Sequence, residues 1–111
     1  MGYMRHDAIV VTSWHKKYLA RGIKKARSLG LFVSNITKEV TNGYRSFLIA
    51  PDGSKEGWDT SDAMDCAREA WKEWANGAYK KGTYLEWAHV SFAGDEEKDT
   101  KIVDQAAREE E

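Results

Sequence analysis

The dipeptide Asn42-Gly43 is the most restrictive local signal in this chain. Both residues tolerate the positive φ angles that a two-residue type I′ hairpin turn requires. Segments rich in β-branched and aromatic side chains lie on either side of it, at residues 31–37 and 44–50. The sequence therefore predicts two antiparallel strands that are neighbours in a sheet and are joined by this turn.

A strand and a helix are expected before this hairpin. Residues 7–13 are rich in β-branched side chains and carry apolar residues on both faces, which predicts a central strand. The helix that follows is expected to have Ser13 as its N-cap and to end at Gly30. Its apolar stripe consists of Leu19, Ile23 and Ala26. Gly22 within this helix either costs about 1 kcal/mol relative to alanine or lets another backbone approach closely.

A second helix and a fourth strand are expected after the hairpin. Thr60 or Ser61 is the expected N-cap of the helix, and Gly82 is preferred over Asn76-Gly77 as its end. One face of this helix consists of Met64, Ala67, Trp71, Ala75 and Ala78, widened by Ala63, Cys66, Ala70 and Trp74. A strand over residues 83–92 follows it.

The order strand, helix, strand, strand, helix, strand is that of the split βαβ, or ferredoxin-like, arrangement. It predicts an α+β sandwich in which a four-stranded antiparallel sheet, in the spatial order 4-1-3-2, has two helices on one face. Residues 1–94 would form this single domain. Residues 95–111 would be an acidic C-terminal tail, either frayed or a short helix. Since this arrangement hosts enzymes, RNA binders and inhibitors alike, it does not define a function.

The charge of the chain is unevenly distributed along the sequence. The formal net charge is −1, but residues 1–48 hold nine Lys/Arg and two Asp/Glu, whereas residues 49–111 hold eight and sixteen. This pattern predicts a dipolar surface, which either steers the protein toward a charged partner or only keeps it solvated.

Residues typical of catalysis or metal binding do not form a recognisable motif. His6, His15 and His89 lack the spacing of a zinc site, and Cys66 is expected to be a small core residue. Nucleophile-elbow, P-loop and dinucleotide-binding sequences are absent. We therefore expect no enzyme activity, no metal and no cofactor. The single cysteine and the lack of a long apolar run favour a cytoplasmic protein without a membrane segment.

Aromatic and basic residues give the functional hypotheses. The favoured one is a non-enzymatic protein-binding module, a regulator or inhibitor of a larger nucleic-acid-handling complex, that docks another protein through Trp58, Trp14 and Trp74. The alternative is a nucleic-acid-binding protein that uses the basic face of the first helix, at Lys17, Arg21, Lys24 and Lys25. A further alternative is a dimeric small-ligand-binding or enzyme domain with its site on the open face of the sheet. Both faces of the second strand are partly apolar, so a homodimer through that open face is also an expectation.

Overall fold

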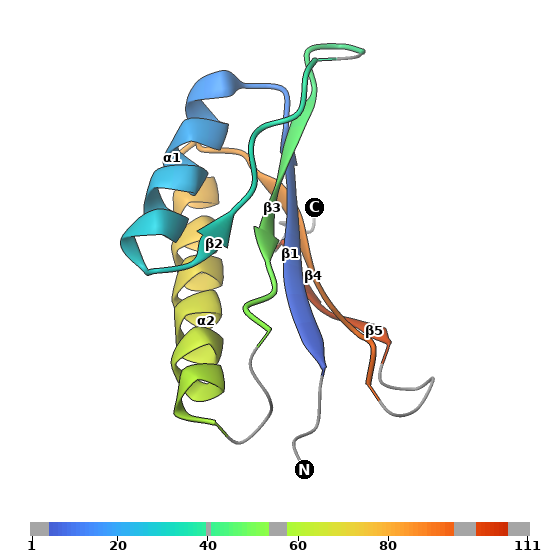
Figure 1. The fold of residues 1–111 in the computed structure, drawn as a ribbon. Coiled ribbons are helices and arrows are strands. Elements are labelled where there is room, and N and C mark those ends of the chain that lie inside the picture. Colours follow the sequence, from blue (N-terminus) through green and yellow to red (C-terminus); the bar gives the residue numbers. More distant parts are fainter. Residues whose placement is uncertain (1–4, 40, 54–57, 95–99, 107–111) are drawn as a thin grey trace.

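The computed structural model describes residues 5–39, 41–53, 58–94 and 100–106. Within these residues the order of elements is β1 (His6–Ser13), α1 (Lys16–Ser28), β2 (Phe32–Val33), β3 (Arg45–Ala50), α2 (Asp59–Lys80), β4 (Glu86–Phe92) and β5 (Lys101–Gln105). The strands form one antiparallel sheet in the order β2-β3-β1-β4-β5. Both helices lie on the same face of this sheet (Figure 1).

The α+β class with two helices is confirmed, but the described chain has a sheet of five strands and not four. Residues 101–105, expected in a tail or a short helix, form β5 and pair with β4. The β-branched pair Ile102-Val103 favours a strand, and the exposed edge of β4 supplies its partner. As expected, β1 is central, between β3 and β4.

The hairpin turn is confirmed. Asn42 and Gly43 have φ angles of 57° and 77°, and the backbone N–H of Tyr44 donates to the carbonyl of Thr41 over 3.2 Å. The strand before the turn is shorter than predicted, because the ladder of β2 covers only Phe32–Val33.

Hydroxyl side chains hold the rest of that segment beside β3. The Ser34 hydroxyl accepts from the backbone N–H of Leu48 over 2.8 Å, and the Thr37 hydroxyl accepts from that of Ser46 over 3.0 Å. Since side-chain oxygens take the place of backbone carbonyls here, the two segments stay adjacent without forming a regular ladder.

The C-terminal ends of both helices agree with the prediction from the sequence, whereas the N-terminal ends differ from it. His15, and not Ser13, caps α1, because its Nδ1 accepts from the backbone N–H of Lys17 over 3.2 Å. The α2 helix begins at Asp59, with Trp58 at the N-cap position, two or three residues earlier than the predicted N-caps Thr60 and Ser61.

Glycines with a positive φ follow both helices, as predicted. Gly30 has a φ of 81° after α1, and Gly82 has a φ of 93° after α2. In each case the next residue donates its N–H back to a carbonyl of the last helical turn, from Leu31 to Ala26 and from Thr83 to Ala78. This is the left-handed helix end for which glycine carries the least strain.

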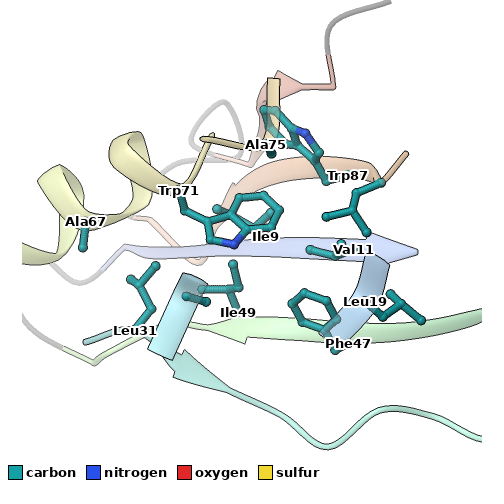
Figure 2. Packing of buried hydrophobic residues seen from close by; sticks show 12 residues of the cluster. Ile9, Val11, Leu19, Leu31, Phe47, Ile49, Ala67, Trp71, Ala75 and Trp87 are labelled. Carbon is teal, nitrogen blue, oxygen red and sulfur yellow. The ribbon is translucent and has the colours of Figure 1, made fainter. Parts of the chain in front are cut away.

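The core lies between the sheet and the two helices (Figure 2). Trp71 of α2 is completely buried, packs edge-on against Trp87 at 6.0 Å, and donates its Nε1–H to the carbonyl of Gly22 over 3.0 Å. A Cβ at Gly22 would lie 3.1 Å from Leu85 Cδ1 and 3.2 Å from Phe47 Cζ. Gly22 thus permits a close approach, but the neighbours are side chains and not another backbone.

The buried face of α2 differs from the predicted one. Ala67, Trp71 and Ala75 are buried as expected, whereas Cys66 is exposed, so the prediction of a core cysteine is wrong. In place of the widened apolar face, the helix buries Arg68 and Lys72, which are each only 3 % exposed.

Candidate functional site

Four aromatic side chains gather where β1 passes into α1, and we call Trp14, Tyr18, Tyr44 and Tyr84 the aromatic cluster. The Trp14 ring is nearly parallel to that of Tyr84, with centroids 6.1 Å apart, and stands edge-on to Tyr18 at 5.9 Å. Trp14, Tyr44 and Tyr84 are 45 %, 41 % and 40 % exposed. These rings therefore present a partly solvent-accessible apolar surface held in a defined geometry.

The backbone explains why these rings meet. Trp14 follows the last residue of β1, Tyr44 precedes β3, and Tyr84 approaches the start of β4, so all three lie at one end of the sheet. The Ser13 hydroxyl donates to the carbonyl of Tyr84 over 3.0 Å, which joins the two segments.

Basic side chains border the aromatic cluster. The His15 ring stacks on Tyr18 with a centroid distance of 4.1 Å. The Arg21 guanidinium lies 5.9 Å from the Tyr18 ring centroid and donates from Nη1 to the Thr83 hydroxyl over 2.8 Å. That hydrogen bond links the first half of α1 to the segment that follows α2.

A groove runs between α1 and α2 and continues from this point. Two pockets of about 500 and 350 Å³ adjoin here and share Arg21 and Trp74 in their linings. Together they are lined by Arg21, Lys24, Lys25, Ser28, Trp74, Gly77, Ala78, Lys81 and Thr83, and we call them the basic groove. Its lining holds four cationic side chains, and no carboxylate of the described residues belongs to it.

The basic groove unites residues that the sequence assigned to competing hypotheses. Arg21, Lys24 and Lys25, predicted for nucleic acid, line it together with Trp74, predicted for a protein partner. Lys17 is exposed on α1 but is not part of the lining.

The other two predicted tryptophans occupy different places. Trp14 belongs to the aromatic cluster, whereas Trp58 is 51 % exposed at the start of α2. Because Thr83, beyond the far end of α2, reaches Arg21, Trp58 lies at the end of the helix remote from the aromatic cluster. The three tryptophans thus do not form one surface.

Sequence reasoning missed part of this surface. Lys81 enters the basic groove from the C-cap of α2, and the pair Lys80-Lys81 before Gly82 was a usable signal for a basic helix end. Tyr44 and Tyr84 join the aromatic cluster from segments that are far apart in sequence, and no local pattern links them to Trp14.

A buried charged network lies at the other side of α2. The Lys72 Nζ is 2.9 Å from His89 Nδ1, and His89 Nε2 is 2.9 Å from Asp7 Oδ1. Because an ammonium only donates, His89 Nδ1 accepts from Lys72 and Nε2–H donates to Asp7. Lys72 also pairs with Glu69 at 2.7 Å and with Asp104 of β5 at 3.4 Å.

This network accounts for the ionisation of Asp7. Burial raises the pKa of the Asp7 carboxyl. The hydrogen bond from His89 and the nearby positive charges of Arg68 and Arg5 lower it by more, so the net pKa lies below its ordinary value. Both ring nitrogens of His89 are engaged in hydrogen bonds, Nδ1 with Lys72 and Nε2 with Asp7. The network therefore stabilises the packing of α2 against β1, β4 and β5.

A pocket of about 290 Å³ opens beside the network. Its lining carries three cations and three carboxylates, namely Arg5, Arg68, Lys101, Asp7, Asp65 and Glu69. Ser91 also lines it, and its hydroxyl is buried without a hydrogen-bond partner among the described residues. Since the charges of this lining balance, the pocket selects no net charge in a ligand.

The face of the sheet opposite the helices is partly apolar, as the second strand suggested. Along β1, Ile9 and Val11 are buried toward the helices, so Val10 between them points to the opposite face, where it is 44 % exposed. By register, Phe32, Phe92 and Ile102 belong to that same face and are also exposed.

The structure adds two observations on metals and membranes. Among residues 5–39, 41–53, 58–94 and 100–106, no group of three or more His, Cys, Asp or Glu side chains is arranged to hold a metal ion. Neither α1 nor α2, the helices of the same residues, is long and apolar enough to cross a bilayer.

Comparisons with protein-family models, with curated proteins and with solved structures find no significant match to this chain.

Proposed function

We propose that this chain is a non-enzymatic nucleic-acid-binding protein whose phosphate contacts lie in the basic groove. The observation that carries the proposal is the convergence of Arg21, Lys24 and Lys25 from α1 with Lys81 from the end of α2 around Trp74. Lysine and arginine side chains bind phosphates and release condensed counterions, which supplies most of non-specific affinity.

The spacing of the cations supports contact with consecutive phosphates. The α1 cations that line the groove, from Arg21 to Lys25, cover four helical steps, about 6 Å at 1.5 Å per residue. That length corresponds to about two phosphates at about 3.4 Å per nucleotide along a stacked strand. The described acidic residues of the second half of the chain do not line the groove. Asp59 and Asp62, for example, lie in the first turn of α2.

The affinity is expected to be modest. The net charge of −1 gives no overall attraction to a polyanion, so binding depends on the local field of the groove. A dissociation constant of about 10⁻⁶ to 10⁻⁴ M, typical of non-specific contacts, is expected.

The test is the salt dependence of binding to a fluorescently labelled single-stranded oligonucleotide, measured by anisotropy. Four cations predict a slope of about −2.8 in log K against log salt concentration, at about −0.7 per contact on a single strand. Lys24→Gln and Lys25→Gln should each reduce the slope by about 0.7. Arg27→Gln, on the same helix but outside the groove lining, should change it little.

Two results would contradict the proposal. One is binding that does not respond to salt. The other is an equal loss in slope for Arg27→Gln and Lys25→Gln, because that would mean the general charge of α1 acts and not the groove.

A protein-binding module is the second candidate, and the apolar open face of the sheet favours it. Val10, Phe32, Phe92 and Ile102 expose large apolar surface there, which is typical of a face covered by a protein, including a second copy of this chain. Sedimentation velocity on wild type and Val10→Asp distinguishes the cases. A wild-type dimer that is lost in the folded variant supports self-association through this face. A wild type that stays monomeric at high concentration refutes self-association.

We also infer that the first six elements form a ferredoxin-like βαββαβ unit, which β5 extends by one edge strand. The position of β1 and β3 at the centre, with β4 and β2 outside them, supports this topology. An experimental structure in which β1 and β3 are not neighbours would remove it.

A further inference from the structure

We infer that the bound nucleic acid is single-stranded and that one of its bases stacks on Trp14 in the aromatic cluster. This inference rests on the proposed function, because it names the form of nucleic acid and the base contact that extend the phosphate contacts of the basic groove.

The geometry of Trp14 suits a stacking platform. Its ring is nearly parallel to Tyr84, and 45 % of the residue remains exposed, so a base can extend a stack that exists already. Tyr84 is itself held edge-on by Tyr18 at 6.0 Å and by Tyr79 at 5.3 Å. Because these contacts fix the rings before binding, little side-chain freedom is lost when a base arrives.

The basic groove leads directly to this platform. Arg21 lines both pockets of the groove and lies 5.9 Å from the ring centroid of Tyr18. Thr83, the partner of its guanidinium, immediately precedes Tyr84 in the chain. A nucleic-acid strand whose phosphates follow the groove as far as Arg21 therefore comes close to the aromatic cluster.

The same geometry argues against a duplex. In a double helix the base faces are occupied by neighbouring base pairs, so an aromatic side chain reaches only an unstacked base. Aromatic platforms beside basic grooves bind single strands with little sequence preference, because every base has a π face.

The test compares three probes of equal length by fluorescence anisotropy: a single-stranded oligothymidylate, an abasic strand and a duplex. Wild type should bind the single strand about 10-fold or more tightly than the abasic strand. Trp14→Ala should lose this preference while it keeps the affinity for the abasic strand. Trp14→Phe should keep most of the preference, and Trp14→Leu, apolar but not aromatic, should not.

Trp58→Ala is the matched control, because Trp58 is exposed to a similar extent and lies at the remote end of α2. It should leave all three affinities unchanged. Circular dichroism establishes that each variant is folded.

The outcomes separate this inference from the proposed function. If wild type binds all three probes equally and with the expected salt slope, the base contact is refuted while the phosphate contacts stand. A base preference that persists in folded Trp14→Ala and Trp14→Leu refutes the assignment of Trp14. If no probe binds at low salt, the proposed function fails and the inference fails with it.

Discussion

Gly22 and Gly77 are interior helical glycines, and substitution by alanine should stabilise the protein at Gly77 but not at Gly22. Replacing either by alanine gains about 1 kcal/mol of helix propensity. At Gly77 a Cβ would meet nothing within 4 Å, so Gly77→Ala should raise the free energy of unfolding by about that amount. At Gly22 the Cβ would lie only 3.1 Å from Leu85 and 3.2 Å from Phe47.

The cost at Gly22 follows from the rigidity of those neighbours. Phe47 and Leu85 are 2 % and 5 % exposed, so neither side chain has solvent into which it can move. Overpacking of this kind costs about 1–3 kcal/mol. Offset by the propensity gain of about 1 kcal/mol, Gly22→Ala should range from neutral to about 2 kcal/mol destabilising.

Urea denaturation followed by circular dichroism measures both variants. Because the propensity gain cancels between them, the difference in free energy isolates the overpacking cost, about 1–3 kcal/mol. Leu85→Val, which removes the nearest atom, should reduce the penalty of Gly22→Ala in the double variant. Equal stabilisation by the two alanines would refute the reasoning, because it would mean that the packing around Gly22 yields freely.

Three further perturbations have definite expected outcomes. Asp7→Asn should cost about 1–3 kcal/mol at neutral pH. Because the pKa of Asp7 is lowered by folding, this gap to wild type should close as the pH falls below the ordinary value of 3.8, and urea denaturation across pH measures it. Truncation after Gly94 removes β5 and one carboxylate partner of Lys72, so it should lower the melting temperature by more than about 8 °C, whereas an unchanged value would mean that β5 contributes nothing to stability. Gly43→Ala should cost about 1–2 kcal/mol because φ is 77° there, while Asn42→Gly should stay within about 0.5 kcal/mol, and both are read from chemical denaturation midpoints.

Elements with a local signal were predictable from the sequence. The turn at Asn42-Gly43 and the helix ends at Gly30 and Gly82 depend on backbone angles that few residues adopt, so the residue type alone carries the information. The central position of β1 followed from apolar residues on both of its faces. The fifth strand carried no comparable signal. All of its residues are exposed, so its sequence lacks the alternation of apolar and polar residues that marks a half-buried strand.

The buried cations of α2 and the basic groove depend on contacts between distant parts of the chain. Arg68 and Lys72 each pair with a carboxylate three residues earlier on α2. Each also pairs with a second carboxylate from a distant part of the chain, Asp52 or Asp104, and no helical period reveals these partners. The cations of α1 were predictable from the spacing of the helix. The groove was not, because it needs α2 to place Trp74 beside them.

The central position of β1 has a consequence for how the chain folds. Its side chains bond to residues far away in the sequence, with Thr12 and Ser46 separated by 34 positions and Asp7 and His89 by 82. Such contacts require long loops to close before they contribute, which slows folding. During synthesis β1 leaves the ribosome before β4, and α1, β2, β3 and α2 emerge in the interval between them. One edge of β1 therefore waits unpaired for most of that time, and we expect a nascent chain halted before residue 86 to be protease-sensitive and prone to associate through that edge.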